Sequence, residues 1–325
     1  MSILVDRESV RRLLDLDDAL ELARQAHVHA ARGEAFIGSA GQLGKRVDGR
    51  RLHGLSATYS GIPVVGMHSS YAFTNEQGRL QTQGYILLHN FSNGQLAALV
   101  EASLISQLAR ACNAALASEF LMPANAAVHT IIADQVNARQ LARSVARVAN
   151  LRECRLVSAE RGEEIGLLAD WIGKTSGVPT VHTADMASAI SDADIISIDG
   201  SSEDWLLRGT QLRPGTHINS LGAIEEGVRE LDTFAVQRCK VYCDHAEHSR
   251  SCAGNLLAAV AEDKWQWERM TGELGQVITG DVPGRTDHDE ITLFNGSGMP
   301  LTEVVLAWEV QLRALEQGQG QQVQL

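Results

Sequence analysis

The sequence predicts an α/β protein with two domains, one of which carries a parallel, Rossmann-like sheet. Three observations lead to this prediction. The chain has 325 residues, which is too long for one small core. Residues 34–100 are strand-like and lie between two helical segments. From residue 126, buried strands alternate with amphipathic helices, which is typical of a parallel sheet covered on both faces.

The first part of the chain predicts an α+β domain. Apolar residues recur at helical spacing over 7–32, where Asp15 and Asp17 give a start signal and Gly33 a stop. Short apolar runs over 34–100 predict strands, and Asn93-Gly94 predicts a hairpin turn. An Ala-rich helix is expected over 102–121, before Pro123.

The second part predicts repeated strand–helix units. Strands are expected at 128–132, 154–158, 180–182, 195–198, 216–221 and 240–243, and helices at 137–148, 163–175 and 186–189. A loop and strand follow over 283–294, and a last amphipathic helix over 300–317. The Gln-rich tail 317–325 predicts disorder.

The junction between strand 128–132 and the next helix has the position of a dinucleotide-binding turn but not its glycines. Such a turn reads G-x-G-x-x-G/A, and its glycines permit a tight turn, close approach of the pyrophosphate and helix packing. Here the three positions are Ala133, Gln135 and Ala138. Gln135 would place a side chain where the pyrophosphate should lie, and Asp134 adds negative charge there.

Composition excludes several classes of function. The formal net charge of −12 makes nucleic acid a poor partner. The start of the chain does not resemble a signal peptide, and no apolar run approaches the ~18 residues that span a bilayer. Five cysteines without disulfide spacing favour reduced thiols in a cytoplasmic protein.

Several segments resemble the ornithine cyclodeaminase/mu-crystallin family. These are Pro283 to Phe294 with Gly298, Leu212 to Ala223 followed by Arg229-Glu230-Leu231, Gly78 to Leu88, and Ala115 to Leu121. They occur in the family's order along most of the chain.

The resemblance implies a dimerisation and substrate domain, an α+β domain over 1–124 to which the final helix, 299–325, returns. It implies a Rossmann-like domain for NAD(P) over 125–298. Family members include cyclodeaminases, imine reductases and amino-acid dehydrogenases, which share hydride transfer at the α-carbon of an amino acid through an imine. The expected partners are therefore a small amino-acid-like metabolite and a second copy of the chain.

The family's catalytic positions differ in this sequence. Where the family has a Lys after a strand glycine, this chain has His68. The family's carboxylate-clamping Arg position is Ala109, and Arg110 is one place later, which rotates it by about 100° on a helix. The family's catalytic acid position is Ile224, with Glu225 one place later. An Arg expected over 34–44 is missing, although Lys45 and Arg46 follow.

These departures define the candidate residues. The candidate catalytic residues are His68, Arg110, Glu225, Asp287 and His288, and the candidate positions of a degenerate cofactor site are Ala133, Gln135, Asn137 and Asp199. An imidazole such as that of His68 can act as an acid or a base near neutral pH, or can simply be a hydrogen-bonded side chain in a cleft. Glu225 either restores the missing carboxylate or is a solvent-facing loop acid. Residues 158–161 offer no clear ribose contact, and Gln81 replaces the family's Thr.

Two further groups of residues could form a metal site or line a pocket. Cys243, Asp244, His245, Glu247, His248 and Cys252 combine metal-binding residue types. They lack a regular ligand spacing, so a solvated polar loop without metal is the expectation. Tyr71, Phe73 and Trp205 could line a pocket, although aromatic residues belong more often to a core or an interface.

The sequence therefore favours a family member that acts on a small amino acid, imine or related metabolite in biosynthesis, without ordinary NAD(P) hydride transfer and with no cofactor required. The alternatives are an ordinary NAD(P)-dependent imine reductase, cyclodeaminase or amino-acid dehydrogenase with an unusual turn, and a non-catalytic ligand-binding or partner subunit.

Overall fold

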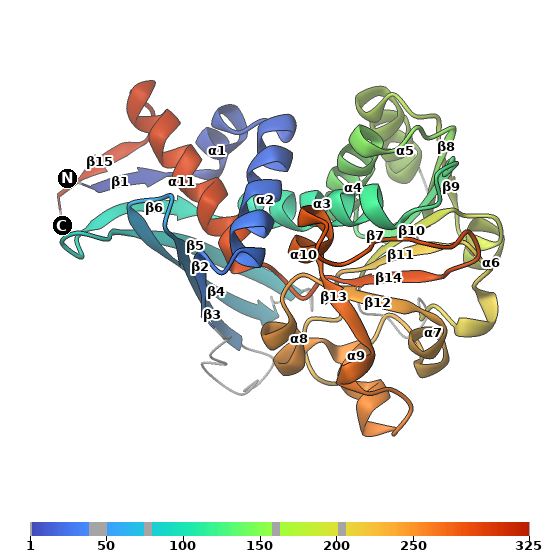
Figure 1. The fold of residues 1–325 in the computed structure, drawn as a ribbon. Coiled ribbons are helices and arrows are strands. Elements are labelled where there is room, and N and C mark those ends of the chain that lie inside the picture. The colour runs from blue at the N-terminus through green and yellow to red at the C-terminus, as the bar shows by residue number, and fades with distance from the viewer. Residues whose placement is uncertain (1, 39–50, 75–79, 158–162, 201–205, 325) are drawn as a thin grey trace. The chain divides into compact units, whose positions relative to one another are not determined.

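The computed structural model describes residues 2–38, 51–74, 80–157, 163–200 and 206–324 (Figure 1). Lys45, Arg46, residues 158–161, Trp205 and the side chain of Gln81 lie outside the described part. By internal contacts the chain divides into two compact units. Unit 1 is Met1–Ala109 with Met299–Leu325, and unit 2 is Arg110–Gly298. The expected domain boundary near residue 125 stays a prediction.

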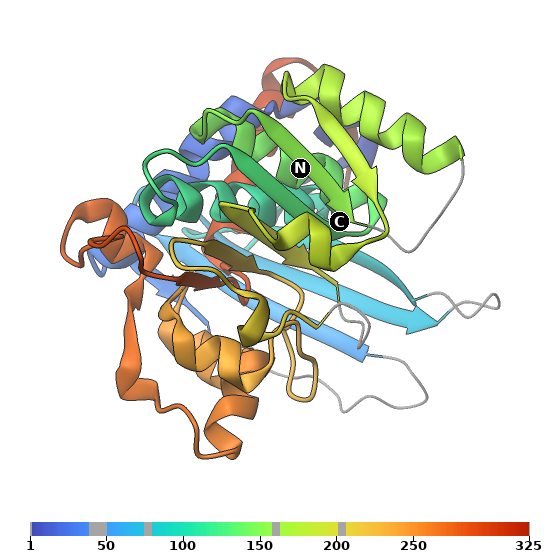
Figure 2. The same cartoon turned by 90° about the vertical axis from the view of Figure 1, so that its right-hand side faces the viewer.

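Unit 1 contains a seven-stranded sheet in the order β15-β1-β6-β5-β4-β3-β2. Its strands are β1 (Ser2–Val5), β2 (Ala35–Ile37), β3 (Arg51–Tyr59), β4 (Val64–Thr74), β5 (Leu80–Asn90), β6 (Leu96–Glu101) and β15 (Gln321–Val323). The long strands β4 and β5 lie side by side (Figure 2). The expectation of a disordered tail is wrong, because β15 pairs antiparallel with β1 and gains backbone hydrogen bonds there.

Three helices of unit 1 flank this sheet: α1 (Arg7–Leu13), α2 (Leu16–Ala31) and α11 (Pro300–Glu316). The helical region expected over 7–32 is divided into α1 and α2. Asp15 is the N-cap of α2, since its carboxylate accepts a hydrogen bond from Asp18 N–H at 2.8 Å. Helix α11 contacts strands β1 to β6. It packs closely against Gly66, where an added Cβ would lie 2.3 Å from Val304.

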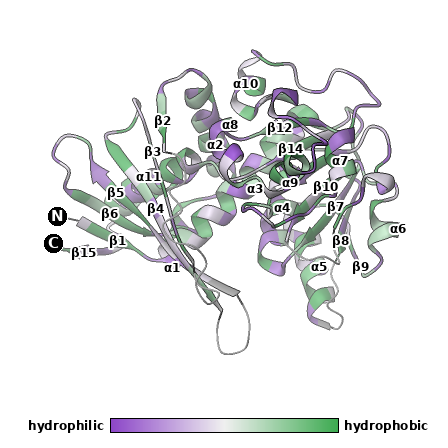
Figure 3. Cartoon of the chain, turned by 90° about the horizontal axis from the view of Figure 1, so that it is seen from below, coloured by the Kyte–Doolittle hydropathy of each residue, from purple (hydrophilic) through white to green (hydrophobic). Residues whose placement is uncertain are grey.

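Unit 2 contains an eight-stranded parallel sheet in the order β13-β12-β14-β11-β10-β7-β8-β9. Its strands are β7 (Val128–Ala133), β8 (Glu153–Val157), β9 (Thr180–Thr183), β10 (Ile195–Asp199), β11 (His217–Ser220), β12 (Lys240–Cys243), β13 (Met270–Glu273) and β14 (Thr292–Asn295). The predicted parallel sheet is confirmed. In Figure 3, which is coloured by hydropathy, much of the hydrophobic green lies in the strands and much of the hydrophilic purple in the loops.

The helices that follow these strands are α4 (Gln135–Val148), α5 (Glu163–Ser176), α6 (Met186–Ile190), α7 (Thr233–Arg238), α8 (Ala246–Cys252), α9 (Gly254–Ala261) and α10 (Leu274–Thr279). Helices α4 and α5 lie on one face of the sheet and α7 and α9 on the other (Figure 1). Helix α3 (Ala102–Leu121) carries the chain from unit 1 into unit 2. Among the described residues, no helix is long and apolar enough to cross a membrane.

Candidate functional site

The strand order of unit 2 reverses between β7 and β10. From β7 the chain builds outward through β8 and β9, and it then returns to add β10 on the other side of β7. In open parallel sheets, the loops diverge at such a reversal and leave a crevice at the carboxyl ends of the strands, where ligands bind. Ala133 and Asp199, which end β7 and β10, are directly paired in register. Two of the predicted cofactor positions therefore lie at the edge where the topology places a ligand.

The turn between β7 and α4 is closed by Asp134. Its carboxylate Oδ1 accepts hydrogen bonds from the backbone N–H groups of Val136 at 2.9 Å and Asn137 at 2.8 Å. The Asn137 side-chain amide donates to the other oxygen at 3.3 Å. Asp134 is thus the N-cap of α4, and its exposed carboxylate holds amides that point from a helix N-terminus.

Arg110 and Asp199 form an ion pair in unit 2. Arg110 Nη1 donates to both carboxylate oxygens of Asp199, at 2.8 and 3.1 Å. Burial raises the pKa of Asp199, whereas the charge of Arg110 lowers it and the charge of Asp134 raises it. The one-residue shift of Arg110 relative to the family pattern therefore gives it a specific partner at the end of β10.

A buried acid that the sequence analysis missed lies beside this pair. The Glu230 side chain accepts hydrogen bonds from Gly200 N–H at 2.8 Å and Gly222 N–H at 2.9 Å, and from the Ser220 hydroxyl. Burial, with a further contribution from the charge of Asp199, raises its pKa to about 8. Glu230 thereby links the residues that follow β10 to those that follow β11.

Asn255 of α9 holds Glu230 in turn. Its carbonyl oxygen accepts from the backbone N–H groups of Glu230 at 2.8 Å and Leu231 at 3.0 Å. Its amide donates to the Ser220 hydroxyl at 2.7 Å. The side chains of Ser220, Glu230 and Asn255 are buried, and their hydrogen bonds brace the carboxyl edge of β10 and β11. The run Arg229-Glu230-Leu231 was the sequence signal for this acid, but nothing local assigned it a partner.

In unit 1, His68 forms a pair with Glu303. His68 Nδ1 lies 2.6 Å from Glu303 Oε2, and the two side chains are 12% and 14% exposed. His68 is on β4, between Leu55 of β3 and Ile86 of β5, and Glu303 is in the first turn of α11. A carboxylate on Nδ1 orients the ring and stabilises its protonated form. Glu303, which lies 235 residues away in the sequence, could not be linked to His68 from the sequence.

The other candidate catalytic residues lie elsewhere. Asp287 and His288 are exposed in the loop that precedes β14, at the amino edge of the sheet and so opposite to the switch point. Glu225 is half-buried in the segment after β11. Their catalytic roles stay predictions, and the structure does not bring Asp287 or His288 together with Asp199.

The segment 243–252 is not the solvated loop that was expected. Residues 246–252 form α8, and Asp244 and His248 are buried. Asp244 accepts hydrogen bonds from the backbone N–H groups of Gly298 at 2.6 Å and His245 at 2.9 Å, while burial raises its pKa to about 6. Within the described residues, no His, Cys, Asp and Glu side chains cluster as metal ligands.

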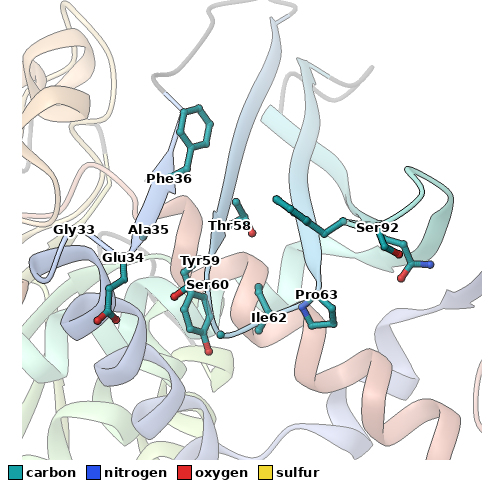
Figure 4. Close-up of a pocket in the computed structure, with 13 residues that line it drawn as sticks. Gly33, Glu34, Ala35, Phe36, Thr58, Tyr59, Ser60, Ile62, Pro63 and Ser92 are labelled. Carbon is teal, nitrogen blue, oxygen red and sulfur yellow. The ribbon is translucent and has the colours of Figure 1, made fainter.

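A cavity of about 770 Å³ lies at the turn end of the unit 1 sheet (Figure 4). It is lined by residues 33–36, 58–63 and 90–92, including Phe36, Tyr59 and Phe91. Tyr59 stacks on His29 with ring centroids 4.2 Å apart. None of the candidate site residues lines this cavity, and its titratable lining groups are Glu34 and Tyr59. It therefore carries no cluster suited to acid–base chemistry.

Comparison with known proteins identifies the family. The model of the ornithine cyclodeaminase/mu-crystallin family matches residues 45–318. The chain belongs to this family. This confirms the resemblance found in the sequence.

Similar proteins include reductases of an imine and structures solved with a nicotinamide cofactor. A Delta(1)-pyrroline-2-carboxylate reductase of Bacillus cereus is 27% identical over 248 residues, which cover 76% of each chain. The Thermococcus litoralis Delta(1)-pyrroline-2-carboxylate reductase, solved in complex with NADH and L-proline, has a TM-score of 0.92 at 21% identity over 99% of this chain and 100% of that one. An archaeal alanine dehydrogenase dimer with bound NAD has a TM-score of 0.91 at 21% identity over 100% and 99%.

These findings contradict the hypothesis that this family member needs no cofactor. The turn lacks the glycines that predict a cofactor, yet structures with the same fold hold NADH or NAD. The switch point between β7 and β10 and the N-terminus of α4 fit a dinucleotide. The Asp134 side chain, which holds two of the amides at this N-terminus, is exposed.

Proposed function

We propose that this protein is an NAD(P)-dependent reductase of a small imine, which it converts to an amino acid. The observation that carries the proposal is the switch point, where strand β7, its turn and α4 form the unit that binds dinucleotides in this sheet class. The family membership and the reductases among its relatives support the substrate class. Reduction of an imine to an amino acid is a biosynthetic step.

Val136 and Asn137 N–H would hold the pyrophosphate, at the N-terminus of α4. The edge braced by Glu230 would position the cofactor at the ends of β10 and β11. When bound, a reduced nicotinamide supplies a hydride to the imine carbon.

His68 would supply the proton that the imine nitrogen takes up in the same reduction. Glu303 holds Nδ1 and favours the imidazolium, which directs proton transfer to Nε2. The C=N bond gains one hydride at carbon and one proton at nitrogen, so atoms and electrons balance. In this assignment His68 takes over the proton transfer that the family's missing acid at Ile224 would otherwise perform.

The experiment measures the oxidation of NADH and NADPH with Δ1-pyrroline-2-carboxylate, together with the affinity of each dinucleotide. We expect turnover with at least one dinucleotide, and a kcat about 10²- to 10⁴-fold lower in His68→Asn with unchanged dinucleotide affinity. His89→Asn, on the neighbouring strand β5, is the matched control and should keep full activity. Failure of both dinucleotides to bind would refute the proposed reductase, and full activity of His68→Asn would refute the role of the histidine.

We also propose a homodimer that forms through the uncovered face of the unit 1 sheet. Four large apolar side chains on this face are exposed: Leu52, Met67, Tyr71 and Tyr85. Tyr71 also stacks on Phe73, with ring centroids 5.8 Å apart. Exposed apolar side chains grouped on one face are typical of an interface.

A further inference from the structure

His68 lies on the face of the unit 1 sheet that packs against α11. Its direct neighbours in the sheet are Leu55 of β3 and Ile86 of β5, and both are buried. Residues directly opposite each other in antiparallel strands share a face, so both side chains lie beside the imidazole. Apolar side chains therefore flank the ring within its own row of the sheet.

The two nitrogens of this ring meet different elements. Nδ1 of His68 lies 2.6 Å from the Glu303 carboxylate, in the first turn of α11. Nε2 approaches the backbone of Gly84 on β5, since a Cβ added to Gly84 would lie 3.1 Å from it. Gly84 is two residues from Ile86 and so on the same face, which means that the ring leans along the strands. We call this position, with Nδ1 on Glu303 and Nε2 against Gly84, the imidazole seat.

The imidazole seat leaves no room for a side chain at Gly84. An added Cβ would lie 2.9 Å from Cβ of Ser70, its direct partner on β4, and 3.0 Å from the Ser69 carbonyl oxygen. Ordinary carbon contacts are roughly 3.5–4.0 Å. Gly84 does not have a positive φ, so the close approach and not the backbone angle requires glycine. Ser70 Cβ and the Ser69 carbonyl are fixed by strand pairing, whereas the imidazole can turn about its side-chain bonds.

We propose that Gly84 is a positioning residue for His68, because its lack of a side chain allows the ring to occupy the imidazole seat. This inference rests on the proposed function, in which His68 Nε2 donates a proton to the imine nitrogen. Gly84 touches neither the substrate nor the cofactor and acts through the ring alone. Proton transfer requires the donor within hydrogen-bond reach of the acceptor, so a small displacement of Nε2 slows it.

Gly84→Ala tests this proposal, because its methyl group must displace Nε2 by a few tenths of an ångström. We expect a kcat that is about tenfold lower, with unchanged dinucleotide affinity. Gly272→Ala is the matched control. Gly272 lies in β13 of unit 2, and its added Cβ would meet Val282 at 3.0 Å and Gln276 at 3.1 Å. This variant introduces similar crowding in a strand and should keep the wild-type kcat.

A double-mutant cycle determines whether the effect passes through the imidazole. In a His68→Asn background, Gly84→Ala should cause no further fall in kcat. A further tenfold fall would overturn the proposal, because Gly84 would then act independently of His68. A wild-type kcat in Gly84→Ala alone would also overturn it.

Exchanging the two residues of the strand pair separates the imidazole seat from the stability of the sheet. Gly84→Ala combined with Ser70→Gly removes the nearest crowded atom and keeps the contact with Nε2. We expect this double variant to fold at least as stably as Gly84→Ala in urea denaturation and to keep the low kcat. A return to the kcat of Ser70→Gly alone would overturn the proposal, since crowding at Ser70 would then be the cause.

Nitrogen-15 NMR of the histidine rings tests the imidazole seat without turnover. The signals that disappear in His68→Asn identify the ring. Gly84→Ala should shift the Nδ1 signal, which reports the hydrogen bond to Glu303, and Gly272→Ala should not. An unchanged Nδ1 signal in Gly84→Ala would overturn the positioning role even in an active reductase. If the protein bound no dinucleotide, the proposed function would fail, while a shifted signal would still support the imidazole seat.

Discussion

At the residue scale, Glu230 explains why Gly222 must be a glycine. A Cβ at this position would lie 2.4 Å from Glu230 Oε1 and 2.7 Å from Gly200 N. These are the atoms of the hydrogen bond that links the segments after β10 and β11. The glycine is therefore required by a close approach of buried polar groups and not by an unusual backbone angle.

We expect Gly222→Ala to lower the free energy of unfolding by about 1–3 kcal/mol, because the added methyl group displaces the buried carboxylate from its donors. Urea denaturation measures the change. Gly166→Ala in α5 is the control. No atom lies within 4 Å of its added Cβ, so the substitution should raise stability by about 0.5–1 kcal/mol. Equal stability of Gly222→Ala and wild type would show that Glu230 is free to move.

At the scale of elements, the two faces of the unit 1 sheet differ in character. One face is covered by α11, against which Gly66 lies so closely that Val304 would clash with an added Cβ. The opposite face exposes Met67 at 40% and Tyr85 at 48%. Side chains on one strand alternate between these environments because successive residues of a strand point to opposite faces.

The proposed dimer predicts that Met67→Asp weakens self-association by about 30-fold or more, since it places a charge in the apolar centre of the face. Sedimentation of the variant and wild type over a range of concentrations measures the dissociation constant. Val181→Asp, at an exposed position of β9 in unit 2, should have no effect. A wild-type protein that remains monomeric at micromolar concentration would exclude the dimer.

At the scale of the whole molecule, buried titratable groups of unit 2 have opposite effects on how the free energy of unfolding depends on pH. Burial lowers the pKa of His129 to about 3 and that of His217 to about 3. Burial raises the pKa of Glu230 to about 8. The two histidines lie in one buried hydrogen-bonded chain that crosses strands β7, β10, β11 and β14 through Ser197, Asn219 and Thr292.

The directions of these pKa shifts predict that the free energy of unfolding has its maximum below pH 7. Below pH 6.5 the histidines take up protons when the chain unfolds, so stability falls as the pH decreases toward 3. Folded Glu230 keeps its proton up to about pH 8 and unfolded Glu230 only to 4.5, so its contribution to stability falls as the pH rises between these values. The two histidines outweigh this loss below pH 6.5, and the net stability falls above it.

Denaturation measured from pH 4 to 9 tests this profile, with an expected maximum at about pH 6.5, where the opposing contributions balance. Glu230→Gln should flatten the alkaline side, and it should leave the acid side unchanged because both histidines remain. A wild-type profile that does not fall between pH 6.5 and 8 would show that Glu230 is ionised in the folded protein over that range.

Local sequence patterns predicted most elements of this fold. Helix 102–121 was predicted with its observed bounds, and the strand–helix alternation after residue 126 was found because periodicity and turn residues are local signals. Helices α7 to α10 and strand β13 were missed, because elements of four to eight residues show little periodicity. The tail was misjudged because its pairing with β1 spans nearly the entire chain.

The candidate site was predicted less well, for a physical reason. The sequence by itself determined the family, the parallel sheet and the absence of glycines at 133 and 135. Only the tertiary structure showed that Arg110 binds Asp199 and that Glu303 holds His68. Burial and partners far along the chain set the charge state and geometry of these groups, and neither is encoded in the residues beside them.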